Sequence, residues 1–202
     1  MLPSLLIAFA GFAFVSSITP GPNNLMLMAS GANFGMRRTL PHLAGVAIGF
    51  SLMVFLVGLG IIAIFNAIPA LYSVLKVGSA LYLTWLAWKI ATAAPAASTQ
   101  SAGRPFSFMQ AVAFQWVNPK GWTMALTAAT VYAPDQTLAA VTMVAVVFGL
   151  VGTPCMALWT LLGQEMRRFL TTSGRLRAFN ITMALILVAS LIPAFLLSAP
   201  AQ

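Results

Sequence analysis

The residues best suited to binding a small charged solute interrupt a long apolar stretch near the N-terminus. Residues 1–36 carry no charged side chain, and the interruption reads Thr19-Pro20-Gly21-Pro22-Asn23-Asn24. Proline has no backbone donor and clashes with the preceding turn, and glycine adds conformational freedom, so a helix must break here. In a membrane, broken backbone is tolerated mainly where it is buried in protein or lines a wet cavity. The break is therefore a candidate transport site.

A new helix that starts at about Asn23 would supply the chemistry for binding a carboxylate. The first amides of a helix have no partners within the helix and are electropositive. Asn23 and Asn24 can offer donors and acceptors to an amino group or to the broken backbone itself. The alternative interpretation is a structural kink that the two asparagines cap. We favour binding, because polar groups at this depth of a membrane usually line a pathway.

A second polar break follows at Asn118-Pro119-Lys120-Gly121. If its helix begins near Phe106, Lys120 lies about 21 Å along that helix. This is deep within an apolar core about 30 Å thick, where a lysine needs a partner or a cavity. Lys120 can pair with a substrate carboxylate or take part in proton coupling, or alternatively snorkel to an interface. The candidate substrate-binding residues of this second break are Gln115, Asn118, Pro119 and Lys120.

Other side chains give little support for metal binding or catalysis. The two acidic residues, Asp135 and Glu165, fall outside the span centres, which weakens a carboxylate relay or a divalent-cation site. We interpret the single histidine, His42, as a satisfied polar anchor near the interface, with a pH-dependent role as the alternative. Cys155 is the only cysteine and is expected to be a packing residue. We therefore expect no enzyme, no cofactor and no metal site.

The composition places the chain in a membrane. Of its 202 residues, 60% are hydrophobic and only 6% are charged, against roughly 25% charged in soluble domains. Long continuous apolar runs favour helices over a barrel, whose strands are short and alternating. The net charge of +8 fits topology signals better than nucleic-acid binding. The predicted fold class is an all-α integral membrane protein that sits in the lipid bilayer.

Six apolar segments are long enough to be transmembrane helices of about 20 residues. They cover about 5–34, 43–64, 71–90, 108–132, 138–163 and 181–197. A linker at about 91–105 separates one half, about 1–90, from the other, about 106–202. We expect these to form a single transmembrane transporter domain over residues 1–202.

The basic residues predict the orientation of the spans. Eight of the ten fall in or beside three connections, at Arg37, Arg38, Lys89, Arg104, Arg167, Arg168, Arg175 and Arg177. Positive charge in short connections marks the cytoplasmic side. Both termini should therefore lie outside the cytoplasm.

The two halves show weak internal similarity. One constant offset relates three residues of the second span, Gly49, Met53 and Gly60, to Gly152, Met156 and Gly163 of the fifth. The first span of each half also carries a break with proline and asparagine. Because each half has three spans, homologous halves would be inverted in the membrane, a recurring design of transporters. We therefore expect two inverted three-helix repeats with broken first helices.

Several motifs together resemble the LysE/RhtB family of amino-acid exporters. Segment 19–24 is similar to the signature of the family's first span, and 32–35 with Arg37, Gly45 and Gly49 continues it. Segments 78–89 and 114–120 resemble the end of the third span and the fourth-span motif, and Asn180 also fits. The third-span ending and the step Gly49-Phe50-Ser51 are most similar to the cysteine/O-acetylserine exporter-like branch. Many relatives have an acidic residue where Phe50-Ser51 stand, so coupling through that carboxylate is not expected here.

The resemblance implies a secondary transporter of the bacterial inner membrane. Its implied activity is the export of small neutral amino acids or derivatives, driven by the proton gradient. The alternatives are a homoserine or threonine exporter, an exporter of another small metabolite and, less favoured, a membrane redox protein or a non-transporting subunit. The sequence leaves a homo-oligomer open.

Overall fold

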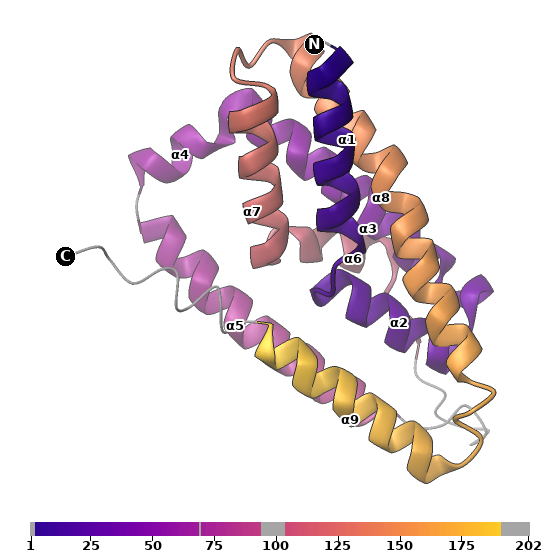
Figure 1. The fold of residues 1–202 in the computed structure, drawn as a ribbon. Helices are drawn as coiled ribbons and strands as arrows, with labels where there is room; N and C mark the ends of the chain where they lie inside the picture. The colour runs from indigo at the N-terminus through magenta and orange to yellow at the C-terminus, as the bar shows by residue number, and fades with distance from the viewer. Residues whose placement is uncertain (1–2, 69, 94–103, 191–202) are drawn as a thin grey trace.

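Every regular element in the part of the chain that the structure describes is helical. The structure is a computed structural model, and it describes residues 3–68, 70–93 and 104–190. Its helices in chain order are α1 Pro3–Ile18, α2 Pro22–Phe34, α3 Met36–Leu56, η1 Val57–Ile61, α4 Ile62–Ala67, α5 Ala70–Ala91, α6 Phe108–Gln115, α7 Pro119–Thr127, η2 Ala128–Tyr132, α8 Leu138–Met166 and α9 Ser173–Ala189. The elements η1 and η2 are π-helical. The predicted all-α class is confirmed (Figure 1).

Helices lie over the described parts of all six segments that the sequence predicts as spans. Two are long and apolar enough to cross a membrane: α3 with η1, over Met36–Ile61, and α8. The pair α1 and α2 would count as a third span, bent by 53° at its break. The six-span count therefore stays a prediction. The end of the expected sixth span and most of the linker lie outside the described residues.

The second segment differs from the continuous helix that its hydropathy predicts. Gly60 adopts φ 99°, a left-handed value that glycine reaches without steric cost. The chain therefore kinks at η1 and continues as the short α4.

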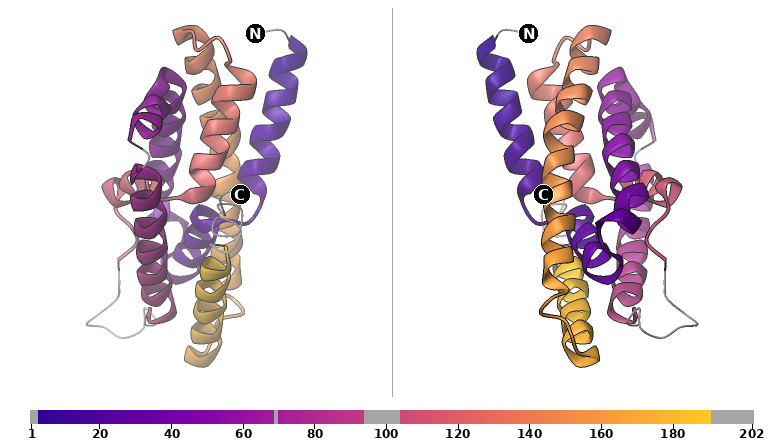
Figure 2. Two further views of the ribbon diagram at one scale, coloured as in Figure 1. Left: turned by 90° about the vertical axis from the view of Figure 1, so that its left-hand side faces the viewer. Right: turned by 90° about the vertical axis from the view of Figure 1, so that its right-hand side faces the viewer.

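Glycines allow four helices to approach at backbone distance. A Cβ atom on Gly31 of α2 would lie 2.1 Å from the Thr160 carbonyl oxygen, and one on Gly163 of α8 would lie 2.0 Å from that of Met28. Gly45 likewise faces the Phe108 carbonyl, so α3 packs closely on α6. Small residues at such contacts are the usual means of packing helices in lipid, where apolar burial between helices gives little driving force. Figure 2 shows the resulting arrangement, in which α5 and α9 also run side by side.

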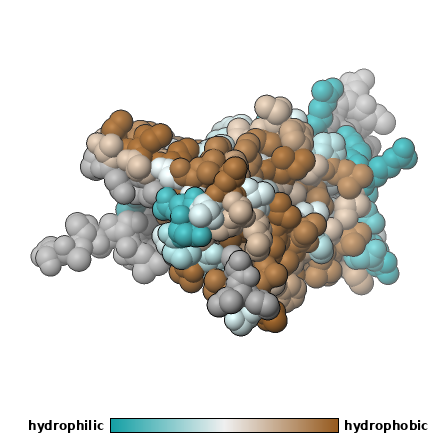
Figure 3. Space-filling view, turned by 90° about the horizontal axis from the view of Figure 1, so that it is seen from above, coloured by the Kyte–Doolittle hydropathy of each residue, from teal (hydrophilic) through white to brown (hydrophobic). Residues whose placement is uncertain are grey.

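An aromatic cluster fixes α1 against the long helices. Phe9 and Phe148 are fully buried with ring centroids 5.3 Å apart, and Phe50 lies 5.2 Å from Phe148 in the same edge-to-face manner. Such pairs add about 0.5–1.5 kcal/mol beyond burial. By contrast, the outer face carries many exposed apolar side chains, shown in brown in Figure 3. An apolar exterior of this extent fits contact with lipid.

The weak sequence repeat is only partly mirrored in the packing. Gly49 of α3 packs on α6, and Gly152 of α8 faces Ser17 of α1, so these two occupy similar places in their halves. Gly60 and Gly163 do not: Gly60 forms the kink with open space around it, whereas Gly163 touches the α2 backbone. Their shared offset therefore reflects no shared structural role.

A candidate transport site where two broken helices meet

The two sequence breaks lie against each other. Asn23, at the start of α2, and Gln115, at the end of α6, form a reciprocal amide pair. Asn23 Nδ2 donates to Gln115 Oε1 at 2.8 Å, and Gln115 Nε2 donates to Asn23 Oδ1 at 3.2 Å. Gln115 is fully buried and also donates to the Ala111 carbonyl. The contact joins residues 92 positions apart in sequence.

Lys120 reaches across from α7 to the first break. Its ammonium donates to the Thr19 carbonyl and hydroxyl, both at 2.9 Å, and to the Pro20 carbonyl at 3.3 Å. A cation suits the C-terminal end of α1, where carbonyls carry partial negative charge. The side chain passes over Gly21, where a Cβ atom would lie 2.6 Å from Lys120 Cδ. In this conformation the broken end of α1 is therefore the hydrogen-bond partner of the Lys120 ammonium.

Each carbonyl from Val15 to Pro20 accepts a hydrogen bond. The Val15 carbonyl accepts from the Thr19 amide, and that of Ser16 from the Thr19 hydroxyl. Asn24 Nδ2 serves the carbonyls of Ser17, at 2.7 Å, and Thr19, at 2.9 Å. The Ile18 carbonyl accepts from Trp159 Nε1 at 3.0 Å, and the Pro20 carbonyl accepts from Lys120. In a membrane the polar groups of broken backbone must find hydrogen-bond partners within the protein, and here they do. The side chain of Asn24 therefore has a structural role at the break.

The amide ends at the two breaks are open by comparison. The N-cap residues of α2 and α7, Gly21 and Asn118, make no side-chain cap hydrogen bond, and each helix has proline in its first turn. Such ends attract anions. Beside them Asn118 is only 2% exposed, and its Oδ1 has no hydrogen-bond partner among the described residues. A buried acceptor without a partner costs about 1–3 kcal/mol, so this atom is suited to a donor from a ligand.

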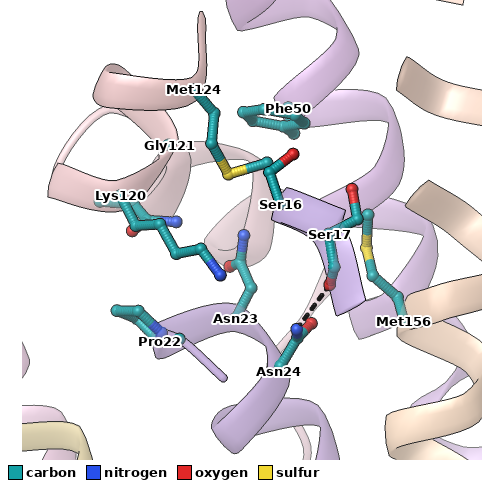
Figure 4. A pocket seen from close by; sticks show the side chains of 12 residues that line it. Ser16, Ser17, Pro22, Asn23, Asn24, Phe50, Lys120, Gly121, Met124 and Met156 are labelled. Atoms are coloured by element: carbon teal, nitrogen blue, oxygen red, sulfur yellow. Dashed lines mark hydrogen bonds between the residues drawn. The ribbon is translucent and has the colours of Figure 1, made fainter. Parts of the chain in front are cut away.

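A cavity of about 30 Å³ lies between these groups (Figure 4). Gly21, Pro22, Asn23, Asn24, Asn118 and Lys120 contribute to its wall. A water needs about 10–15 Å³ of such space, so about two or three waters fit and an amino acid does not. The site must open before it can bind a substrate of that size.

Nine of the ten candidate residues form this cavity wall or contact residues that do. Thr19 and Pro20 bond Lys120, and Gln115 bonds Asn23. Pro119 fixes the first turn of α7 between Asn118 and Lys120, both in the wall. Sequence reasoning missed further wall residues: Ser16, Ser17, Phe50, Gly121, Met124 and Met156. Ser17 lies two residues before the break and Met156 was part of the weak repeat, but neither signal predicts a shared cavity.

Comparison with known proteins agrees with the resemblance drawn from the motifs. Residues 14–195 match the family described as LysE type translocator. The chain is also similar to cysteine/O-acetylserine efflux proteins of Escherichia coli O9:H4 (strain HS), Escherichia coli (strain K12) and Shigella sonnei (strain Ss046). It is 36% identical to each over 193 residues, which cover 93% of this chain and 96% of the relative. No solved structure gives a significant match. The chain therefore belongs to the LysE type translocator family.

Proposed function

We propose that this protein is a secondary transporter that exports small neutral amino acids or derivatives, of the cysteine and O-acetylserine type, across a bacterial inner membrane. Family membership and the names of the relatives support this assignment. The observation that carries it is the convergence of two open helix starts, one ammonium and one unpartnered amide oxygen on a single cavity.

These groups complement an amino acid. The carboxylate would bind at the open amides of α2 and α7, where the partial positive charge of each helix is concentrated. The substrate ammonium would donate to Asn118 Oδ1, which lacks a donor in the described structure. None of the described residues of the wall is acidic, so a second cationic group of a dibasic amino acid would find no counter-charge among them. This favours neutral substrates.

Lys120 would exchange partners during transport. Among the described residues of the wall it alone has a titratable side chain, and it is held by the end of α1 while the cavity is small. A substrate carboxylate that enters would compete with those carbonyls for the ammonium. If export is driven by protons, Lys120 is the group in this wall that can release and bind one.

The two halves would move around this site as inverted repeats of one transporter domain. The similar positions of Gly49 against α6 and Gly152 against α1 support this arrangement. We place both termini outside the cytoplasm, because the basic connections lie together: Arg167 approaches Gly35, and Lys89 and Arg104 line one cavity.

Transport by the purified protein in liposomes tests the proposal. We expect counterflow of labelled O-acetylserine or cysteine, little of lysine, and sensitivity of net efflux to a protonophore. Lys120→Met should abolish transport, whereas Lys76→Met, which removes the same charge from α5 outside the wall, should retain it. Transport of homoserine or threonine instead would redirect the substrate assignment. No transport of any of these by the purified protein would contradict the proposed function.

A further inference from the structure

A second and much larger cavity lies along the other half of α2. Its volume is about 550 Å³, within the range of about 300–1,000 Å³ usual for small-molecule sites. Its walls come from α2, α3, the end of α5 and the start of α6, and they include Ser30, Asn33, His42, Lys89, Arg104 and Gln110. The charged residues of this wall belong to the basic connections, so the cavity lies toward the expected cytoplasmic side.

His42 is not the satisfied anchor that its position in the sequence suggested. It is 1% exposed, and neither Nδ1 nor Nε2 has a hydrogen-bond partner among the described residues. Its ring lies 5.4 Å from that of Phe106, and it forms part of the cavity wall. A neutral imidazole offers one donor and one acceptor, so leaving both unmet in protein is costly unless a ligand or water supplies partners.

The charged side chains in the wall of the large cavity favour binding of an anion. Lys89 and Arg104 are exposed cations, and none of the described wall residues is acidic. Asn33 is bonded to Asn180 and to the Ala29 carbonyl, and Ser30 is bonded to Thr39, so His42 is the buried polar group of this wall that lacks a partner among the described residues. We propose that this cavity is a second, entry-side binding site for the carboxylate of the exported solute, with the imidazole of His42 as its deepest donor. The proposal rests on the proposed export function.

Helix α2 connects this cavity to the site at the breaks. Asn23, in the wall of the small cavity, and Met26, Ser30 and Asn33, in that of the large one, follow the three- and four-residue spacing of one helix face. From Asn33 to Asn23 is about 15 Å along the axis. Met26 is only 3% exposed and lies between the two polar ends. A carboxylate would thus be attracted by Lys89 and Arg104, bind at His42, and pass along this face of α2 to the start of α2 at Asn23.

An anionic lipid headgroup shares the carboxylate's chemistry and could also bind Lys89 and Arg104. The buried position of His42 favours a small solute, since a headgroup tethered to its acyl chains would stay near the exposed cations. The experiment must therefore separate these two sources of negative charge.

The single histidine of the chain provides a site-specific probe. Protein labelled with ¹⁵N-histidine in bilayers of neutral phosphatidylcholine should give one imidazole spin system, and it can be titrated at constant pH with acetate and O-acetylserine. Serine methyl ester, which lacks a free carboxylate, is the ligand control. We expect saturable shifts with the two carboxylates and none with the ester. The double variant Lys89→Gln and Arg104→Gln should weaken the apparent affinity about tenfold, while Arg177→Gln, outside the cavity, should leave it unchanged.

The outcomes separate this inference from the transport proposal. Shifts with both carboxylates would support the second site even if the liposomes show no transport, which would overturn the proposed function alone. An unchanged His42 signal at concentrations that saturate transport would overturn the second site and leave the exporter standing. Equal shifts with the methyl ester, or shifts produced only when anionic lipid is added, would also overturn it.

Discussion

The contact between Gly21 and Lys120 makes a quantitative prediction about the first break. In Gly21→Ala the new Cβ would lie 2.6 Å from Lys120 Cδ, whereas ordinary contact begins at 3.4 Å, so the lysine must move by the difference, 0.8 Å. Its ammonium then loses good geometry with acceptors now at 2.9, 2.9 and 3.3 Å. Gly21 has φ −176°, so alanine brings no backbone strain.

The expected cost is the loss of charge-assisted hydrogen bonds, worth about 1.5–3 kcal/mol, partly offset by about 0.4–1 kcal/mol from restricting the unfolded chain. We therefore expect Gly21→Ala to destabilise the protein by about 1–2 kcal/mol. Lys120→Met should cost at least as much, because the Pro20 carbonyl then loses its donor. In the Lys120→Met background, Gly21→Ala should cost nearly nothing, since there is no ammonium left to displace.

Thermal unfolding followed with a thiol-reactive fluorophore measures these effects. Cys155 is the only cysteine and is buried, so its labelling reports unfolding. Gly11→Ala is the matched control, because no atom of the described residues lies within 4 Å of its new Cβ. If the two substitutions at the break add to within about 0.5 kcal/mol, Gly21 and Lys120 do not act through their contact and the reasoning fails.

Further predictions concern the packing and the polar contacts of the breaks. Gly31→Ala and Gly163→Ala should each reduce the free energy of unfolding by about 3 kcal/mol or more. The new Cβ atoms would lie 2.1 and 2.0 Å from backbone carbonyl oxygens, which cannot move aside as a side chain can. Unchanged melting temperatures would show that α2 and α8 are farther apart than described. Gln115→Ala should slow transport and destabilise by about 1–3 kcal/mol, and adding Asn23→Ala should cost little more; full additivity would argue against the amide pair. Trp159→Phe removes one donor to the end of α1 and should lower the melting temperature by about 2–6 °C, with unchanged melting refuting that bond.

Local chemistry explains why the breaks could be predicted from sequence. Pro20, Pro22 and Pro119 lack a backbone donor wherever the fold places them, which favours helix ends near these residues, although Pro41 and Pro154 lie inside α3 and α8. The hydropathy pattern likewise predicts the helices that lie over the described parts of the six apolar segments. These features depend on near neighbours in sequence.

Features that depend on distant contacts could not be predicted in the same way. The partner of Lys120 is a set of acceptors about 100 positions earlier, and Trp159, which serves the same helix end, carries no local signal. His42 is a similar case, since whether its nitrogens find partners depends on what packs around this part of α3. The kink at Gly60 was also missed, because a glycine in an apolar run fits a straight helix equally well.

The way the broken end of α1 is held has a consequence for leakage. Lys120 and the Asn23–Gln115 pair hold the two breaks together with side-chain hydrogen bonds, and a solute with a carboxylate and an ammonium carries groups that can replace them. Without such a solute, opening the cavity would strand an ammonium and several carbonyls in a poorly solvated site. Ions and metabolites that lack both groups would therefore meet a closed protein. If the small cavity is the proposed transport site, these hydrogen bonds would keep the protein closed when it holds no solute, and the membrane would then not leak when there is nothing to export.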